Sequence, residues 1–441
     1  MPLALSVFGL GYVGSVTAAC LAHLGNRVLG VDVNLSKVAA LEAGRSPILE
    51  AGLDKMISQC RRACRLHATE DATQGVLETE VSFISVATPC QPNGQPDLTA
   101  IHHVSRQIGC ALKQKNSFHW VVLRSTVLPG TTESVVSPVL EACSGKKAGV
   151  DFGVCFMPEF LREGSAIADF LEPPFTIYGT RHGEHLQSLR DLLDWAPGPH
   201  YQTTAATAEM VKYMCNAFHA LKVGFANEVG TLCRNLGVDT ETAIRIFTSD
   251  TRFNLSEAYL KPGFAFGGSC LPKDLRALTY RAKQLDLQLP LLQSLLASND
   301  EHIERAFDAI MGLNKRKIGL LGLSFKPGTD DVRESPLVIL VKRLLGEGCQ
   351  VRIWDENVSL GTLIGSNRQF MDRFLPHICC LLTQSLDAVM DEAEVVLVGT
   401  RSVEKETLAS MLKPGQIVVD LVNLERPLRY DGPEKYLGIC W

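Results

Sequence analysis

The sequence predicts an α/β protein in which two Rossmann-like domains, each with a doubly wound parallel sheet, are joined by a central helical domain with a long helix. Apolar runs typical of strands alternate with amphipathic stretches near the N-terminus, and the same alternation returns near the C-terminus. The region between them has helical periodicity and no clear strand. The length of 441 residues fits about three domains. We expect a first Rossmann-like domain over residues 1–202, a helical domain over 203–300 and a last Rossmann-like domain over 301–441.

The predicted strands fall into two groups. The first group covers residues 3–9, 27–31, 81–87 and 120–123, and the second covers 317–322, 350–354, 395–398 and 417–421. Strands that alternate with longer helical segments form βαβ units, whose strands run parallel. Between the groups, residues 206–236 form the long predicted helix.

Composition restricts the class of partner. The net charge is -5 with no basic run, which argues against binding to nucleic acid or to anionic membranes. The N-terminus lacks the basic start of a signal peptide, and no stretch reaches the ~18 apolar residues of a spanning helix. The 14 cysteines are scattered and none forms a Cys-x-x-Cys pair. We therefore expect a cytoplasmic protein that acts on a small molecule.

A glycine-rich turn follows the first predicted strand and opens a helix. Gly9, Gly11 and Gly14 form the GxGxxG pattern of dinucleotide sites, in which the glycines permit a tight turn, close approach of a pyrophosphate and close helix packing. Asp32 ends the second strand, where an acidic residue binds the ribose hydroxyls, and no arginine adjoins it. This favours NAD over NADP. Lys37 is either a contact to the adenosine side or an ordinary surface charge.

One cysteine differs from the rest. Cys270 follows a flexible glycine-rich stretch and precedes Pro272, which suits the first residue of a helix extending to residue 284. The helix N-terminus and the nearby Lys273 are both expected to lower the pKa of its thiol, giving a nucleophilic thiolate. Asp274 is either a helix-dipole residue or a group that positions water and accepts a proton.

A polar stripe follows the long predicted helix. Four polar residues share one helix face: Lys212, Asn216, His219 and Asn227. The last three follow Lys212 by 4, 7 and 15 positions. Solvated helix faces often show such stripes. Here much of the remaining circumference is apolar, which favours a helix that lines a polar site.

Further charged residues lie next to predicted strand ends. Glu163 is a candidate acid or base with Glu159 as a supporting partner, although both fit ordinary ion pairs with arginine. Lys326 and Arg333 follow the first strand of the last domain and suit a phosphate, or else are exposed surface cations. Residues 330–331 indicate a turn rather than a metal site, because no His or Cys lies at metal spacing.

Taken together, these motifs resemble the UDP-glucose/GDP-mannose dehydrogenase family over essentially the whole chain. The resemblance is carried by Gly9 to Gly14, Ser46-Pro47-Ile48 with Glu50, Thr88-Pro89, Arg124 to Val127, Pro129-Gly130, Pro158 to Glu163, Lys212 with Asn216, Gly267 to Cys270, Lys273-Asp274, Phe325-Lys326 and Arg333 to Ser335. It implies oxidation of a sugar C6 alcohol to a carboxylate with two NAD, four electrons in all.

The resemblance also implies a role for each residue. Cys270 would be the nucleophile, and Lys212 and Asn216 would steady the oxyanion. Asp274 would move a proton through water, Glu163 would serve thioester hydrolysis, and Thr126 would lie between cofactor and substrate. The implied NAD contacts are Gly9, Gly11, Tyr12, Val13, Gly14, Asp32, Lys37, Thr88, Thr126, Lys273 and Arg333. The implied sugar-nucleotide contacts are Glu163, Lys212, Asn216, His219, Asn227, Tyr259, Lys261, Phe264, Gly267 and Lys326.

The sugar is predicted from smaller features. His219, the stretch 264–270 and the C-terminal residues 438–441 resemble the members that oxidise GDP-mannose for mannuronate polymers such as alginate. Ala258 and Lys261 depart from that group, which tends to have Tyr and Arg there. A Lys lacks the planar bidentate donor of Arg, so base or phosphate recognition is expected to differ.

Other functions remain open at this point. The same chemistry on UDP-glucose or a UDP-N-acetylhexosamine is one, and a two-electron 3-hydroxyacid dehydrogenase without a catalytic cysteine is another. A non-catalytic nucleotide-sugar sensor is a third, against which the joint presence of Cys270, Lys212, Asn216 and Asp274 argues. We expect a homodimer or a higher homo-oligomer, with the central helix at the interface and domain exchange as a variant.

Overall fold

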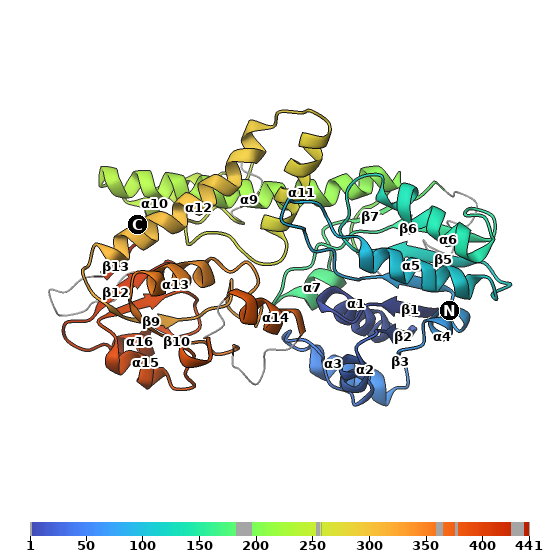
Figure 1. Ribbon diagram of the computed structural model, residues 1–441, viewed down its shortest axis with the longest axis horizontal. Coiled ribbons are helices and arrows are strands. Elements are labelled where there is room, and N and C mark those ends of the chain that lie inside the picture. Colours follow the sequence, from blue (N-terminus) through green and yellow to red (C-terminus); the bar gives the residue numbers. More distant parts are fainter. Residues whose placement is uncertain are drawn as a thin grey trace. The chain divides into compact units, whose positions relative to one another are not determined.

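The computed structural model describes residues 2–181, 196–252, 256, 258–358, 365–374, 378–424 and 436–440. The chain forms two compact units, the first made of residues 1–215 and 276–281 and the second of residues 216–275 and 282–441. Each unit contains one sheet (Figure 1). The division into three domains at residues 202 and 300 stays a prediction.

The first unit contains an eight-stranded sheet in the order β3-β2-β1-β4-β5-β6-β7-β8. Its strands are β1 Ala4–Phe8, β2 Arg27–Val31, β3 Leu66–Thr69, β4 Val81–Ile84, β5 His119–Leu123, β6 Phe152–Phe156, β7 Thr176–Gly179 and β8 His200–Thr203. Strands β1 to β6 pair in parallel, in the order of a doubly wound nucleotide-binding sheet. Strand β7 pairs antiparallel with β6, and β8 is parallel to β7. The predicted parallel sheet is therefore extended by two strands of opposite direction.

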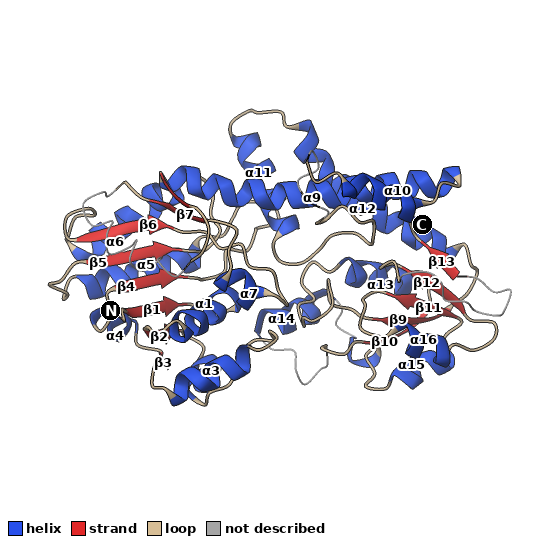
Figure 2. Cartoon of the chain, turned by 180° about the vertical axis from the view of Figure 1, so that it is seen from behind, coloured by secondary structure: helices blue, strands red, loops and turns tan. Residues whose placement is uncertain are grey.

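Helices cover both faces of this sheet (Figure 2). They are α1 Tyr12–His23, α2 Leu35–Glu42, α3 Leu53–Arg62, α4 Ala72–Leu77, α5 Thr99–Leu112, a π-helical turn Thr132–Val136, α6 Ser137–Ser144 and α7 Ala166–Leu171. Successive side chains of a strand point to opposite faces. In β1, Val7 accordingly packs in the core with α1 and α3, whereas Phe8 packs in the core with α4 and α5.

The regular elements that the structure describes between residues 205 and 311 are helices, as the sequence predicts. They are α9 Ala205–Leu236, α10 Thr240–Ser249, α11 Leu271–Gln284 and α12 Pro290–Met311. Pro290 is the first residue of α12, where its missing N–H costs no hydrogen bond. None of the described helices is long and apolar enough to cross a membrane.

The second unit contains a five-stranded sheet in the order β10-β9-β11-β12-β13, in which all pairs are parallel. Its strands are β9 Lys317–Leu321, β10 Gln350–Trp354, β11 Val395–Val398, β12 Ile417–Asp420 and β13 Tyr436–Gly438. The remaining helices are α13 Pro336–Gly346, α14 Gly365–Phe374, the 3-10 turn Ile378–Cys380, α15 Leu386–Glu392 and α16 Lys405–Met411. Cores on both faces, one including α12 and α13 and the other α15 and α16, make this sheet doubly wound too. The predicted fold class is confirmed.

Candidate active site

The glycine turn after β1 fits a dinucleotide phosphate. Gly9 has φ +94°, a backbone conformation that favours glycine. A Cβ on Gly14 would lie 1.7 Å from the Gly9 carbonyl oxygen, so α1 packs against the turn only because this side chain is absent. A Cβ on Gly11 would meet nothing within 4 Å, which leaves open space at the start of α1. Helix α1 has no side-chain cap, so its first N–H groups suit a phosphate.

Asp32 lies at the end of β2 and also holds this turn in place. Its Oδ2 accepts a hydrogen bond from the Leu10 N–H at 2.6 Å, and its Oδ1 accepts from the Asn34 N–H at 2.8 Å. The Lys37 ammonium lies 3.4 Å from Oδ2. A carboxylate offers about four acceptor positions, so these contacts leave capacity for a ribose hydroxyl. The residues present therefore fit NAD.

Changing Asp32 to Asn is expected to weaken NAD binding about tenfold to hundredfold, because a hydrogen bond to a charged group contributes about 1.5–3 kcal/mol. Fluorescence titration with NADH measures the change. Asp355 is the matched control, because it accepts from the Leu323 N–H at 2.6 Å and the Asn357 N–H at 2.8 Å at the end of β10. Asp355→Asn should leave NADH affinity unchanged, and equal losses in both variants would contradict a cofactor contact at Asp32.

Loops that follow β4 and β5 meet beside the glycine turn. The Thr88 hydroxyl donates to the Thr126 carbonyl oxygen at 2.8 Å, so two of the predicted NAD contacts lie together. Gly9 approaches the same region, since a Cβ there would lie 2.9 Å from the Ser85 carbonyl oxygen. Ligands of doubly wound sheets bind at this carboxyl edge of the strands.

Glu209 on α9 is a residue of this region that the sequence does not predict. Its fully buried carboxylate accepts from the N–H groups of Gly130 at 2.5 Å and Thr132 at 2.9 Å, and from the Thr132 hydroxyl at 2.6 Å. Burial raises the pKa of Glu209. The contacts fix the end of the turn that begins at Thr126. An acidic residue among the small and apolar residues at the start of the long helix is the available sequence signal.

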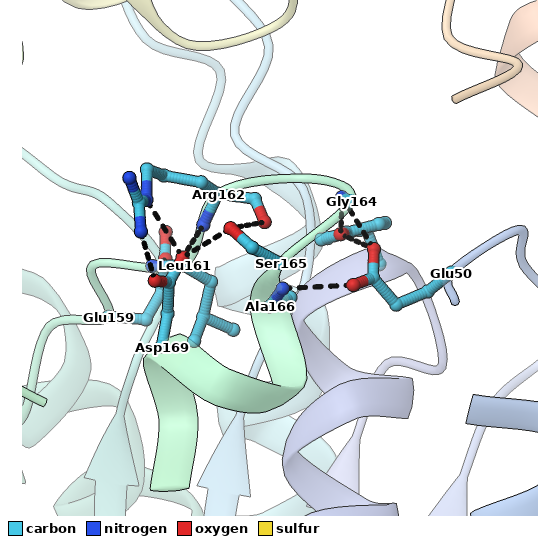
Figure 3. A network of polar contacts seen from close by, with 9 residues as sticks. Glu50, Glu159, Leu161, Arg162, Gly164, Ser165, Ala166 and Asp169 are labelled. Carbon is cyan, nitrogen blue, oxygen red and sulfur yellow. Dashed lines mark hydrogen bonds and ion pairs between the residues drawn. The ribbon is translucent and has the colours of Figure 1, made fainter. Parts of the chain in front are cut away.

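The loop between β6 and α7 carries Glu163, and carboxylates hold it at several points (Figure 3). Glu159 accepts from the Leu161 N–H at 2.7 Å. Asp169 pairs with the Arg162 guanidinium at 2.6 Å and also accepts from the Arg162 N–H at 2.8 Å. The arginine near Glu163 therefore has Asp169 as its partner.

Glu50 holds the other end of the same loop. Its carboxylate accepts from the N–H groups of Gly164 at 2.7 Å and Ala166 at 2.9 Å, and from the Tyr12 hydroxyl (Figure 3). Tyr12 is the first residue of α1. Glu50 belongs to a motif that carries the family resemblance, but its partners lie up to 116 residues away.

Lys212 forms a buried ion pair within the first unit. Its ammonium lies 3.1 Å from Oε1 of Glu159, and the two side chains are 5% and 8% exposed. The same ammonium lies 5.4 Å from the centre of the Phe160 ring. Glu159 supplies the nearby opposite charge that a buried cation needs. Its supporting role beside Glu163 stays a prediction.

Cys270 directly precedes α11 in the second unit and is exposed. Its carbonyl oxygen accepts from the Asp274 N–H at 2.9 Å, which is the first hydrogen bond of the helix. Gly268 has φ +81°, and a Cβ there would lie 2.9 Å from the Phe325 ring. The predicted helix start at the cysteine is present, and the glycine before it is required by backbone conformation and by space.

Asp274 lies under this helix start and is 1% exposed. The Asn216 amide donates to its Oδ2 at 2.5 Å, and the Lys273 ammonium lies 2.7 Å from its Oδ1. A carboxylate that only balanced the helix dipole would not need these partners. The structure therefore brings Asn216 of α9 and Lys273 to Asp274, which lies four residues after Cys270.

The stretch around residues 259–264 contacts the polar face of α9. Tyr259 has φ +66°, and its ring stacks on His219 with the ring centres 4.5 Å apart. Asn227 accepts from the Gly263 N–H at 3.0 Å and donates to the Phe264 carbonyl oxygen at 3.3 Å. His219 and Asn227, which the sequence assigns to substrate binding, thus contact the predicted substrate loop. Lys261 is exposed.

The second sheet repeats the turn of the first. Gly322 follows β9 with φ +93°, and Asp355 ties the turn that follows. Here the turn leads to Lys326 and Arg333 instead of a second GxGxxG motif. Arg333 forms two hydrogen bonds with Asp331, at 2.9 and 2.6 Å, so part of its donor capacity is used within the loop. The described residues contain no cluster of three or more His, Cys, Asp or Glu suited to a metal ion.

A dinucleotide turn at the carboxyl edge of one doubly wound sheet is typical of a nicotinamide-dependent oxidoreductase, and the other unit carries an exposed cysteine at a helix start. The chain belongs to the UDP-glucose/GDP-mannose dehydrogenase family. Residues 3–195 match its NAD binding domain, 206–301 its central domain and 319–427 its UDP binding domain. NAD as cofactor is thereby confirmed.

Individual relatives cover the whole chain. It is 46% identical to GDP-mannose 6-dehydrogenase of Pseudomonas aeruginosa over 99% of this chain and 100% of the relative. It is 37% identical to UDP-glucose 6-dehydrogenase AglM of Haloferax volcanii over 80% of this chain and 83% of that protein. The solved UDP-glucose dehydrogenase of Pyrobaculum islandicum is 35% identical, covers 100% of this chain and 98% of its own, and has a TM-score of 0.89.

Proposed function

We propose that this protein oxidises GDP-mannose at C6 to GDP-mannuronate, with two NAD consumed per sugar. The observation that carries the proposal is the buried Asp274, which lies four residues after Cys270 and contacts both the Asn216 amide and the Lys273 ammonium. Two-electron alcohol dehydrogenation has no need of a thiol. The choice of GDP-mannose is supported by the 46% identity to a GDP-mannose 6-dehydrogenase along the full chain.

In the first oxidation, Asp274 takes the proton of the C6 hydroxyl through a water while C6 loses a hydride, which gives the aldehyde. NAD, when bound, supplies the hydride acceptor for both oxidations. The Lys212 ammonium and the Asn216 amide donate to the oxygen on which negative charge develops. Electrostatic stabilisation of this kind contributes about 2.7–4 kcal/mol per donor.

In the second oxidation, the Cys270 thiolate adds to the aldehyde carbon and forms a C–S bond, because an aldehyde has no hydroxyl from which oxidation can start. The resulting thiohemiacetal loses a hydride from C6 and becomes a thioester. Glu163 then takes a proton from a water that attacks the thioester, and the C–S bond breaks to release the thiolate. The sum converts the alcohol, one water and two NAD⁺ into a carboxylate, two NADH and three protons.

The NADH yield at exhaustion of a limiting sugar nucleotide tests the proposal. We expect two NADH per GDP-mannose and little turnover of UDP-glucose or UDP-N-acetylmannosamine. One NADH per sugar would contradict the four-electron reaction. Turnover of a UDP-sugar alone would support the four-electron reaction but change the substrate to that sugar nucleotide. If no sugar nucleotide were turned over, the result would favour a non-catalytic nucleotide-sugar sensor.

UDP-glucose is the second candidate substrate, because Lys261 stands where the GDP-mannose group tends to have Arg. This side chain is exposed and belongs to the loop whose backbone Asn227 holds. Lys provides a point charge rather than two parallel donors, so recognition of the base or the diphosphate is expected to be weaker. The substrate panel decides between the two sugars directly.

The proposal includes a homodimer formed through α9, with domain exchange between copies as a variant. Met214, Phe225, Leu232 and Leu236 on this helix are between 46% and 67% exposed. They recur at near-heptad spacing, which is the pattern of a helix that packs against another helix. Neighbouring α10 adds the exposed Ile246. Sedimentation velocity would test the assignment, and a monomer at micromolar concentration would refute it.

A cytoplasmic location and a role in supplying mannuronate polymers such as alginate complete the proposal. Among the described residues, Cys20, Cys60, Cys155 and Cys349 are buried and form no disulfide. Reduced thiols are typical of the cytoplasm. GDP-mannuronate is an activated uronic acid, so the class of reaction that consumes it is glycosyl transfer to a growing polysaccharide.

A further inference from the structure

We propose that Glu50 is a positioning residue for the reaction, which fixes the Glu163 loop to the start of α1 and thereby sets the rate of thioester hydrolysis. This inference rests on the proposed function, because it takes Glu163 as the group that activates the hydrolytic water. Glu50 is not itself placed against substrate or cofactor. It acts through Glu163 on one side and through Tyr12 on the other.

Glu50 forms hydrogen bonds with the two loop residues that directly follow Glu163 and Ser165. Oε2 accepts from the Gly164 N–H at 2.7 Å and from the Tyr12 hydroxyl, and Oε1 accepts from the Ala166 N–H at 2.9 Å (Figure 3). Gly164 follows Glu163 directly and has φ +84°, a backbone conformation that favours glycine. The Glu50 residue is 6% exposed, which protects these hydrogen bonds from water.

Burial and the negative charge of Glu163 both raise the pKa of the Tyr12 hydroxyl, which is the group that donates to Glu50. The hydrogen bond to Glu50 and the negative charge of Glu50 raise this pKa further. Tyr12 therefore stays protonated and donates to Glu50. Tyr12 is also the first residue after the phosphate-binding turn, so one hydrogen-bonded chain links the cofactor turn to the catalytic loop.

The other anchors of the loop do not replace this one. Glu159 and Asp169 hold Leu161 and Arg162, which precede Glu163. Glu50 holds Gly164 and Ala166, which follow it. A carboxylate accepts all three donors at once, whereas a glutamine offers one acceptor oxygen and turns an NH₂ group toward N–H groups. Glu50→Gln should therefore release the loop on one side of Glu163.

Stopped-flow measurement of NADH in the Glu50→Gln enzyme tests the proposal with GDP-mannose as the probe. We expect a first phase of about two NADH per active site at the wild-type rate, followed by a steady state about tenfold to hundredfold slower. The slow phase should coincide with a covalent adduct on Cys270, detected by intact-protein mass spectrometry. Glu163→Gln should show the same two phases.

Two variants make the test specific. Glu42→Gln is the matched control, because Glu42 accepts from the Ala68 N–H at 2.6 Å and pairs with Arg61 at 2.6 Å in the same unit. The time course of NADH formation in this variant should equal that of the wild type. Tyr12→Phe keeps the ring but removes the donor to Glu50 and an acceptor 3.2 Å from the Gly164 N–H, and should slow the steady state severalfold. It should add no further loss when combined with Glu50→Gln, because both variants release the same loop residue.

The positioning role of Glu50 would be overturned if the Glu50→Gln enzyme formed NADH with the wild-type time course. It would also be overturned if the first phase and the steady state were slowed by the same factor. If that variant does not fold, Tyr12→Phe decides, and an unchanged steady state in it would overturn the proposal. Turnover of a UDP-sugar in place of GDP-mannose would refute only the proposed substrate, and the same test would then use that sugar. No turnover of any sugar by the wild type would overturn both.

Discussion

Replacing Cys270 with alanine is expected to abolish formation of the sugar acid, with a fall in its rate of at least about 10⁴-fold. The aldehyde then has no thiolate to add to it, so the second hydride transfer has no starting adduct. The first oxidation does not involve sulfur. The NADH yield per GDP-mannose should therefore fall from two to at most one, with aldehyde rather than acid identified by chromatography.

Cys110→Ala provides the matched control for this result. Cys110 is exposed on α5 in the first unit, so the variant removes an accessible thiol without touching the start of α11. It should keep two NADH per sugar. A Cys270→Ala enzyme that still forms two NADH and the acid would exclude the thioester route and favour oxidation of a hydrated aldehyde.

Changing Lys212 to methionine is expected to lower kcat by about 10²–10³-fold and the free energy of unfolding by about 3–5 kcal/mol. The first loss comes from the missing donor to the oxyanion. The second comes from Glu159, whose side chain is 8% exposed and would keep its charge without a cation 3.1 Å away. Steady-state kinetics and urea denaturation measure the two effects separately.

The double variant Lys212→Met with Glu159→Gln separates catalysis from stability. It removes the carboxylate charge that Lys212 no longer balances and that faces the Arg124 guanidinium, while the glutamine oxygen still accepts from the Leu161 N–H. Most of the lost stability should return, and kcat should stay low. A single Lys212→Met variant with wild-type kcat would show that the ammonium serves only to balance Glu159.

The fold could be predicted where local pattern is strong. Strands β1, β2, β9 and β10 are apolar runs next to clear turns and were predictable to within a residue or two. Strand β6 carries the same apolar signal, but it is not among the predicted strands. Strands β3, Leu-His-Ala-Thr, and β8, His-Tyr-Gln-Thr, carry polar and partly exposed side chains at or near the sheet edge, so no hydrophobic pattern marks them. The direction of β7 depends on pairing with β6, which local pattern does not encode.

The candidate site divides in the same way. The glycine turn and the cysteine at a helix start are local motifs whose chemistry follows from neighbouring residues. The contacts of Asn216 with Asp274 and of Glu50 with Ala166 join residues 58 and 116 positions apart. Such pairs are set by sheet order and helix packing. The catalytic and binding roles of these residues stay predictions until the variants are measured.

The same device, an aspartate that holds a glycine turn, occurs in each of the two units. Asp32 and Asp355 each fasten a glycine turn within their own sheet, at matching distances and in separate units. A substitution that removes either carboxylate is therefore expected to loosen the glycine turn of its own unit. Each turn can thus tolerate or lose its carboxylate separately, in a chain that is similar both to a relative named for GDP-mannose and to one named for UDP-glucose.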